Sequence, residues 1–255
     1  GQLGRTTNSS RVYIFENHQA DDGSARTSMR FEWAAQGVAP RLQTGDFQNI
    51  DLRAQGLSRW AEVLDAGGFL HAVMDDLPEI EKSLLVDLNA QSILIMPILV
   101  EGHWWGSIGF DQVQAQYLWS NADIDALRAA AGILAGAIQR AQTQAAWNRA
   151  EEKYRGIFEN AVEGVFQSSP DGKFITANPA LAQMLGYETP QELMASVRDI
   201  HTQLYIEPGA HQEIAQLIET QNFVKNYFLQ MRRKDGTLIW VTQHARAVRG
   251  EDGAV

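Results

Sequence analysis

The chain has 255 residues, a length that suggests two domains of ordinary size. Hydrophobic residues make up 45% and charged residues 20%, so neither a disordered nor a fibrous class fits. A net charge of −10 without a basic block argues against nucleic acid and against anionic membrane surfaces as partners. The absence of cysteine excludes disulfides, thiolate metal sites and thioether-linked chromophores.

The longest helical apolar run, residues 129–138, is about half of the roughly 20 residues that a membrane span needs. We therefore expect no membrane span and a cytoplasmic location. The chain begins with glycine and shows no signal peptide, so we expect it to be a piece of a longer protein.

The first half of the chain is predicted to form strands with a few helices. Strand patterns occur at residues 11–15, 27–34 and 69–73, and helical spacing at 58–64 and 78–88. Within the second strand, Met29, Phe31 and Trp33 are expected on one face. Residues 93–100 and 103–110 predict a hairpin that turns at Glu101-Gly102, with Pro97 at a bulge or an unpaired position.

A long helix follows, beginning at a capping box formed by Ser120 and Asp123, with no proline from residue 121 to 155. Its apolar residues recur at alternating spacings of three and four, the spacing of a heptad seam between two paired helices. We expect a homodimer through this seam, while Gly132 and Gly136 lie off it and let the helix approach its own sheet. The alternative is a single amphipathic helix that covers its own domain. The seam residues are Ile124, Leu127, Ala131, Leu134, Ile138, Ala141 and Ala145.

The second half predicts a hairpin, several short helices and a second hairpin. Residues 164–168 and 174–177 flank a turn rich in polar residues, and Asn178-Pro179 and Thr189-Pro190 each mark a helix start. A third helix is expected at 211–220, and strands at 224–232 and 238–248. This order predicts an α+β fold in which helices cover one face of an antiparallel sheet.

These residues resemble two known families. Residues 152–166 resemble the opening of a bacterial PAS domain, and the resemblance continues to the end of the chain through Asp171-Gly172, residues 177–180, residues 185–187, residues 233–236 and Trp240. Residues 11–145 resemble a GAF domain of the bacterial sensor type. The stretches that carry this second resemblance are residues 12–18, 97–98, 105–111, 119–120 and 125–127.

The resemblance implies two antiparallel-sheet domains joined by a long helix, in a cytoplasmic sensory input module. We place the GAF-like domain at 1–145, a linker helix at 146–160 and the PAS-like domain at 161–255. Such modules precede a histidine kinase, a diguanylate cyclase or phosphodiesterase, or a class III nucleotide cyclase. The sequence carries none of those catalytic signatures, so we expect this segment to be non-catalytic and to pass a signal along the helix to a downstream effector. An enzyme with its own active site is a weaker alternative.

A second hypothesis is that one domain binds a small metabolite. Aromatic and apolar residues in each domain are candidates to line a pocket between the sheet and its helices, and the alternative is that they fill a dry core. The candidates are Phe31, Trp33, Trp60 and Phe69 in the first domain, and Phe166, Met184, Tyr227 and Trp240 in the second.

No cofactor is expected. The lack of cysteine argues against a linked bilin and against a covalent flavin adduct. Haem would need one histidine in an apolar pocket, and His71, His103, His201 and His211 are the candidates to examine. Because a lone histidine in a helix is usually a surface group, we do not expect haem, and no metal site is predicted. The resemblance also implies that the PAS-like sheet lacks its fifth strand, which would begin at residues 253–255.

Overall fold

The computed structural model describes residues 9–248, which form two compact units that divide between Ala146 and Trp147. The division lies inside one helix, so the linker segment expected at 146–160 belongs almost entirely to the second unit. We call residues 9–146 unit 1 and residues 147–248 unit 2. Both units are mixed α and β structures with antiparallel strand pairing, as the sequence predicts.

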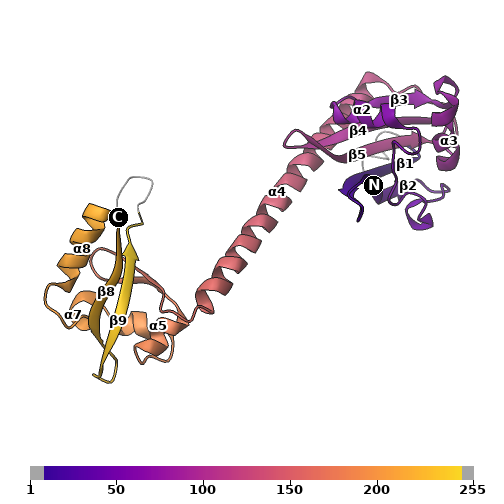
Figure 1. The fold of residues 1–255 in the computed structure, drawn as a ribbon. Helices are drawn as coiled ribbons and strands as arrows, with labels where there is room; N and C mark the ends of the chain where they lie inside the picture. Colours follow the sequence, from indigo (N-terminus) through magenta and orange to yellow (C-terminus); the bar gives the residue numbers. More distant parts are fainter. Residues whose placement is uncertain (1–8, 249–255) are drawn as a thin grey trace. The chain divides into compact units, whose positions relative to one another are not determined.

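Unit 1 is built on a five-stranded antiparallel sheet (Figure 1). Its strands lie in the order β2-β1-β5-β4-β3. Their bounds are β1 Arg11–Gln19, β2 Ala25–Ala34, β3 Leu70–Val73, β4 Ser92–Val100 and β5 His103–Gln112. The predicted hairpin is β4–β5, and Glu101 and Gly102 both take the left-handed backbone conformation that such a turn requires.

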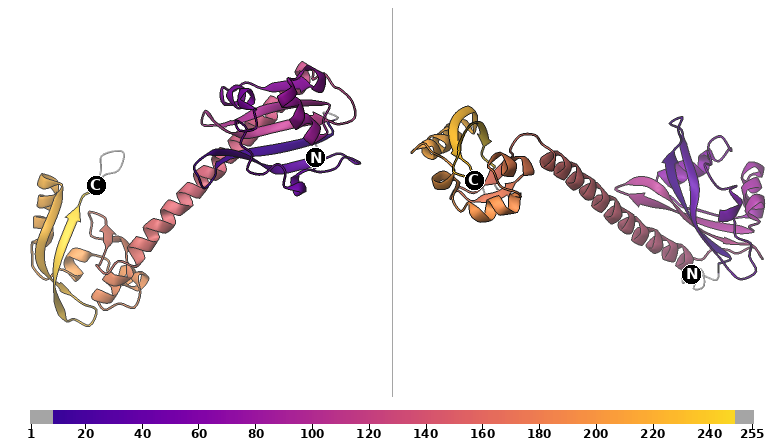
Figure 2. Two further views of the ribbon diagram at one scale, coloured as in Figure 1. Left: turned by 45° about the vertical axis from the view of Figure 1, so that its right-hand side comes forward. Right: turned by 90° about the horizontal axis from the view of Figure 1, so that it is seen from below.

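Both faces of this sheet are covered. The helices α2 (Ser58–Asp65) and α3 (Glu79–Leu88) lie on one face with the short turns η1 (Leu42–Thr44) and η2 (Met74–Asp76), and α4 (Asn121–Glu159) lies on the other (Figures 1 and 2). The interior strand β4 is apolar on both sides for this reason. Its Ile93 and Ile95 belong to the core under α2, whereas Leu94 and Met96 belong to the core under α4.

Pro97 pairs in register with Ser107 of β5, and the bulge in this ladder falls between Ile98 and Leu99 rather than at the proline. The other neighbour of β4 is β3, which pairs only with Ser92 to Ile95. Pro97 therefore has a register partner on β5 and none on β3, so it is unpaired on one side only.

The helix α4 is unbroken over 39 residues, or about 58 Å at 1.5 Å per residue. Its start is the predicted capping box. The Asp123 amide donates to Ser120 Oγ at 3.2 Å, and the Ser120 amide donates to Asp123 Oδ2 at 2.9 Å.

The expected dimer seam packs within unit 1. Leu127 and Ala131 are buried in the core beneath α4, and Ile124, Leu134 and Ile138 pack against that core. Ala141 is exposed and Ala145 is half-buried. Over residues 124–138 the helix therefore covers the sheet of its own unit. This is the alternative to a dimer seam that the sequence left open. The expectation that Gly132 lets the helix approach its sheet is wrong, because Gly132 is exposed and a Cβ added there would meet no heavy atom within 4 Å, whereas Gly136 is half-buried.

Unit 2 contains two separate two-stranded sheets and four short helices. The strand pairs are β6 (Phe166–Ser168) with β7 (Phe174–Ala177), and β8 (Phe223–Arg232) with β9 (Leu238–Arg246). The helices are α5 (Pro179–Met184), α6 (Pro190–Ser196), α7 (Ile200–Gln203) and α8 (Ala210–Gln221). Within residues 9–248 the two sheets share no ladder, and the expected site of a fifth strand lies outside the described residues.

The predicted helix starts of unit 2 are present. The Asn178 side chain accepts from the Leu181 amide at 3.0 Å, and Thr189 Oγ1 accepts from the Glu192 amide at 3.1 Å. The sequence analysis missed α7, a single turn capped by Asp199. The buried core lies between the helices and the inner faces of the strands, with Leu185, Leu193 and Leu229 fully enclosed.

Candidate functional site

A small cavity lies inside unit 1, between the sheet and α2. Its volume is about 60 Å³, and it adjoins an open hollow of about 610 Å³ with which it shares Thr27, Ile50, Leu52 and Trp104. Its lining is almost entirely apolar and aromatic. The aromatic residues around it are Tyr13, Phe15, Phe47, Trp60 and Trp104.

Tyr13 supplies an unpaired polar group in this lining. Its side chain is buried, and its hydroxyl has no hydrogen-bond partner among the described residues. Burial raises the pKa of Tyr13 above its ordinary value, and the nearby Asp111 carboxylate raises it further. The phenol therefore stays neutral and can donate or accept a hydrogen bond to a molecule in the cavity. An unpaired buried hydroxyl carries a free-energy penalty that such a molecule would remove.

The position of the Tyr13 ring depends on a glycine in the neighbouring strand. Tyr13 is paired with Gly109 of β5, and a Cβ at that glycine would lie 2.3 Å from the ring. Glycine is therefore the residue that leaves room for the ring against β5. The ring edge then meets Phe15, whose centroid is 5.7 Å away, and Phe15 meets Phe47 at 6.4 Å.

The two tryptophans of the cavity are held by hydrogen bonds. Trp60 Nε1 donates to Glu81 Oε2 at 2.8 Å, and Arg59 Nε donates to Glu81 Oε1 at 2.9 Å. The Arg59 guanidinium accordingly holds the pKa of Glu81 below its ordinary value. Trp104 Nε1 donates to Ser107 Oγ at 3.1 Å. These bonds fix both rings in place, so the cavity is shaped before anything binds.

Charged and polar side chains line part of the hollow outside the cavity. Arg26 forms an ion pair with Asp51, and the backbone amide of Ala54 and the Arg26 guanidinium together lower the pKa of Asp51. Ser28 Oγ accepts from the Asn49 amide at 2.8 Å and lies 2.8 Å from His18 Nε2. The site as a whole has an apolar interior and a charged mouth, which suits a small molecule with one apolar and one polar end.

A buried ion pair lies behind the cavity. Arg11 Nη2 and Asp111 Oδ2 are 2.8 Å apart, and Arg11 also donates to the Leu88 carbonyl at the end of α3. Both side chains are fully enclosed. Burial raises the pKa of Asp111 to about 6, although the Arg11 charge opposes this. The pair fixes β1 to β5 and to α3, and so supports the strands that carry Tyr13 and Gly109.

Of the four residues expected to line a pocket in unit 1, one lies at the cavity and three do not. Trp60 lines the cavity, but Trp33 and Phe69 pack on the α4 side of the sheet and Phe31 is exposed. The cause is a register shift between β1 and β2, where Ile14 pairs with Phe31 and Phe15 with Met29. The extra residue reverses the faces, so the expectation that residues 29, 31 and 33 share one face is wrong. Met29 lies in the core under α2.

In unit 2, Phe166 and Tyr227 pack against the core, whereas Met184 and Trp240 are exposed. The last two therefore do not lie between sheet and helices, contrary to the expected lining. His71 and His103 are exposed, with His71 stacked on Phe69, and His201 and His211 stack on each other. Within residues 9–248 no three histidine, aspartate or glutamate side chains are placed to hold a metal, and no helix is long and apolar enough to cross a membrane.

The sheet of unit 1 thus carries a small apolar cavity on one face and the helix α4 on the other. A family model described as GAF domain matches residues 2–138, more than half of the chain, and one described as PAS domain matches residues 162–255. The chain belongs to the GAF domain family and carries a PAS domain after it.

Two curated relatives are similar to it. The chain is 38% identical over 149 residues to the methanogenesis regulatory histidine kinase FilI of Methanothrix harundinacea, a match that covers 58% of this chain and 17% of that protein. It is 24% identical over 182 residues to an uncharacterized protein of Azorhizobium caulinodans, covering 69% of this chain and 24% of that protein. The matched regions thus span a quarter or less of each relative.

Solved GAF domains are among the structures to which the chain is similar. GAF3 of Slr1393 from Synechocystis sp. PCC6803, in its photoproduct state, has a TM-score of 0.48 and 20% identity, covering 57% of this chain and 92% of that one. The PixJ GAF domain of Thermosynechococcus elongatus, in its blue-light absorbing form, has a TM-score of 0.44 and 18% identity, covering 58% and 87%.

Proposed function

We propose that this chain is a non-catalytic, cytoplasmic input module in which occupancy of the unit 1 cavity changes α4 and thereby a downstream effector domain. One observation carries this proposal: the sheet of unit 1 bears the cavity on one face and α4 on the other. On β4, Ile95 lines the cavity and its neighbours Leu94 and Met96 belong to the core beneath α4.

The strands provide a short mechanical path. On β1, Tyr13 lines the cavity and its neighbour Val12 belongs to the core beneath α4. On β5, Ser107 lines the cavity and its neighbour Ile108 belongs to the core beneath α4. Because protein interiors are close-packed, a displacement of cavity residues must be taken up by the opposite face of the same strands. Leu127 and Ala131 of α4 lie in that opposite core. A ligand that binds two arrangements of this packing with different affinity would shift α4 between them.

The cavity favours a small, flat, mostly apolar ligand with one polar group near Tyr13. A cavity of about 60 Å³ is smaller than an engineered cavity of about 150 Å³ that binds benzene. A ligand of benzene size or larger must therefore extend into the hollow. An effector of the histidine kinase class is supported by the similarity to FilI, and a diguanylate cyclase, a phosphodiesterase or a class III nucleotide cyclase are the other candidates.

A matched pair of probes tests the ligand site. Indole and indene have nearly the same shape, but only indole carries an N–H that can reach the Tyr13 hydroxyl. We expect indole to bind more tightly, and Tyr13→Phe to weaken indole about fivefold, the effect of one hydrogen bond of about 1 kcal/mol, with indene unchanged. Hydrogen exchange in residues 124–138 should change on binding. Binding without any response in that segment would refute the path from cavity to helix.

We also propose that the module is a homodimer through the outward face of α4. Ile133, Trp147, Tyr154 and Ile157 are 73, 68, 64 and 66% exposed, and the first three fall at multiples of seven residues. A heptad repeat of exposed apolar residues is the pattern of paired helices. This face lies opposite the expected seam, which already packs against the sheet.

Two double variants separate the faces in sedimentation equilibrium at tens of micromolar. Trp147→Glu with Tyr154→Glu should abolish association and leave unit 1 folded. Leu134→Asp with Ile138→Asp should disrupt unit 1 itself, because both side chains pack against its core. A wild-type protein that is monomeric under these conditions would overturn the dimer, and would leave the cavity proposal to its own test.

A further inference from the structure

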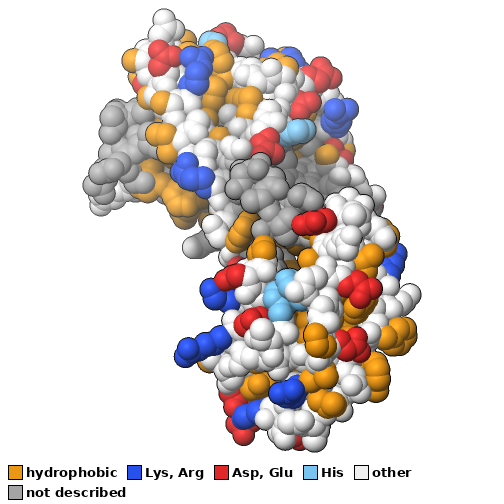
Figure 3. All heavy atoms as spheres, turned by 90° about the vertical axis from the view of Figure 1, so that its left-hand side faces the viewer, with side chains coloured by type: hydrophobic (Ala, Val, Ile, Leu, Met, Phe, Trp, Pro, Cys, Tyr) orange, Lys and Arg blue, Asp and Glu red, His pale blue; other side chains and the backbone are white. Residues whose placement is uncertain are grey.

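Two histidines of unit 2 are stacked face to face. The ring centroids of His201 and His211 are 3.3 Å apart and the rings are inclined by 21°. His201 lies in α7 and His211 in the first turn of α8, so the stack joins two helices. Both side chains are half-buried, that of His201 being 19% exposed, and Figure 3 shows pale blue histidine side chains at the surface beside acidic and basic ones. The stack is thus within reach of protons from solvent.

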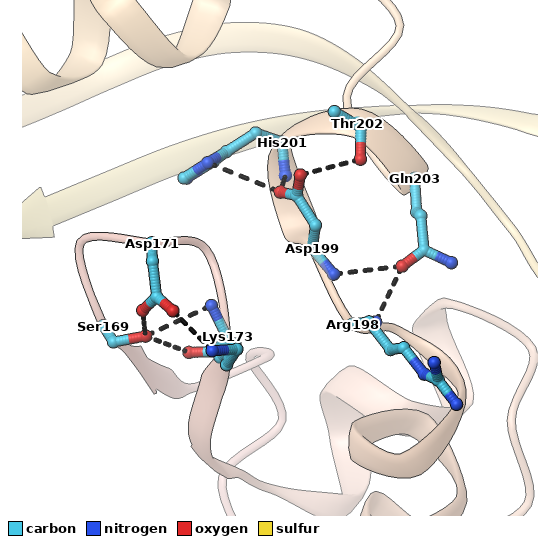
Figure 4. A network of polar contacts seen from close by, with 8 residues as sticks. All are labelled: Ser169, Asp171, Lys173, Arg198, Asp199, His201, Thr202 and Gln203. Carbon is cyan, nitrogen blue, oxygen red and sulfur yellow. Dashed lines mark hydrogen bonds and ion pairs between the residues drawn. The ribbon is translucent and has the colours of Figure 1, made fainter.

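The hairpin turn between β6 and β7 closes over this pair. The Ile200 amide donates to the Gly172 carbonyl at 2.8 Å. A Cβ added at Gly172 would lie 2.7 Å from Asp199 Oδ1 and 2.8 Å from His201 Nδ1. Asp199 in turn caps α7, accepting from the His201 amide at 2.9 Å and from Thr202 Oγ1 at 2.8 Å (Figure 4). Turn, α7 and α8 therefore meet at the two rings.

Two carboxylates lie near His201, and neither forms a strong ion pair with it. Asp199 Oδ1 lies 3.5 Å from His201 Nδ1, a distance that gives only a weak ion pair. Asp171 in the turn also favours a charged His201, but its carboxylate is engaged by Lys173 Nζ at 2.6 Å and by Ser169 Oγ at 2.5 Å (Figure 4). The ring of Tyr205 completes the surroundings, with its centroid 6.0 Å from that of His201.

Protonation works against the stack. Burial lowers the pKa of His201 below its ordinary value of 6.5, and the neighbouring His211 lowers it further. Because the folded-state pKa of His201 is depressed, its contribution to stability is present above pH 6.5 and is lost as the pH falls below that value.

We propose that the His201–His211 stack is a proton-operated clasp that holds the first turn of α8 against α7 at neutral pH and releases it in acid. When both rings carry a proton, two like charges face each other at stacking distance and the helices separate. The first turn of α8 also holds Glu213, which accepts from Tyr227 Oη at 2.7 Å, so release reaches β8. This gives unit 2 an input of its own, acidity, which is independent of the unit 1 cavity.

The experiment follows the whole chain from pH 8 to pH 5 by NMR of the histidine ring protons and by hydrogen exchange normalised for pH. We expect the two rings to titrate as a coupled pair. The protection of the amides of residues 210–217 against exchange should fall about tenfold in acid, because one pKa unit of coupling corresponds to a factor of ten. His211→Phe keeps a flat ring and removes the charge, so it should retain protection and bring the pKa of His201 closer to 6.5.

His244→Gln is the matched control, since His244 is exposed on β9 and belongs to no histidine pair, and it should respond to acid like the wild type. Independent titration of the two rings in the wild-type protein would overturn the clasp. So would unchanged protection of residues 210–217 down to pH 5. Neither result depends on a variant that folds, and neither bears on the unit 1 cavity.

Discussion

Removal of one charge from the buried Arg11–Asp111 pair should destabilise unit 1 strongly. Arg11 Nε lies 3.2 and 2.9 Å from the two carboxylate oxygens of Asp111, and both side chains are enclosed. Asp111→Asn keeps the shape of the side chain but leaves a buried guanidinium without a counter-charge. Breaking a buried pair in this way costs about 3–5 kcal/mol of unfolding free energy. An arginine cannot escape the cost by losing its proton, so the guanidinium stays charged and unpaired at both pH 5 and pH 8.

The opposite variant, Arg11→Met, should behave differently. Asp111 then loses its partner, but a carboxyl group can take up a proton. Burial already raises its pKa to about 6 with Arg11 present, and without that charge the pKa must rise further. A raised folded-state pKa means that stability is lost as the pH rises through it. The cost of Arg11→Met should therefore be large at pH 8 and smaller by about 1–2 kcal/mol at pH 5.

Urea unfolding followed by tryptophan fluorescence measures both variants, because most tryptophans report on unit 1. They are Trp33, Trp60, Trp104, Trp105 and Trp119. The double variant completes the cycle and should cost less than the sum of the single changes, since it leaves no unpaired charge. Equal costs for Arg11→Met at pH 5 and pH 8 would refute the reasoning, because the carboxylate would then not be desolvated as described.

Three further changes test other parts of the structure. Gly109→Ala should push the Tyr13 ring into the cavity, destabilise unit 1 by about 1–3 kcal/mol and weaken the indole probe, measured by urea unfolding and calorimetry. Gly172→Ala should cost more than Gly236→Ala in a thermal melt, since both glycines have positive φ but only the first faces atoms within 3 Å. Absorbance titration should show the Tyr227 phenol ionising near pH 12, a step missing in Tyr227→Phe, because burial and a carboxylate raise its pKa to about 12.

Local signals in the sequence were sufficient for several helix starts but not for every boundary, since the strand expected at residues 11–15 runs to Gln19. The capping box at Ser120 and Asp123 and the caps at Asn178 and Thr189 form as predicted, because each depends on residues only three apart. The order of strands and helices likewise predicted the α+β class. The single turn of α7 was missed because four residues carry too little periodicity to be recognised.

The cavity could not be found from the sequence, because its geometry depends on one unpaired residue. A bulge between β1 and β2 puts Phe15 opposite Met29 and reverses which residues face α2. No residue in that segment marks the bulge, since Arg30 looks like any exposed strand residue. Tyr13 carries a faint signal, a tyrosine among apolar neighbours, but its pairing with Gly109 is separated by nearly a hundred positions. Strand register is a tertiary property, and a shift of one residue changes every face beyond it.

The heptad pattern of α4 is a second case in which the sequence does not identify the packing partner. Periodicity identifies the face of a helix that is buried, but not what buries it, and a sheet and a second helix both accept residues spaced by three and four. The sheet takes this face up to Ile138. Beyond that point no described residue of α4 belongs to the core of unit 1, yet Trp147, Tyr154 and Ile157 continue an apolar repeat on the opposite side. An isolated helix gains little from exposing two aromatic rings to water, so we expect this second repeat, and not the first, to determine the oligomeric state.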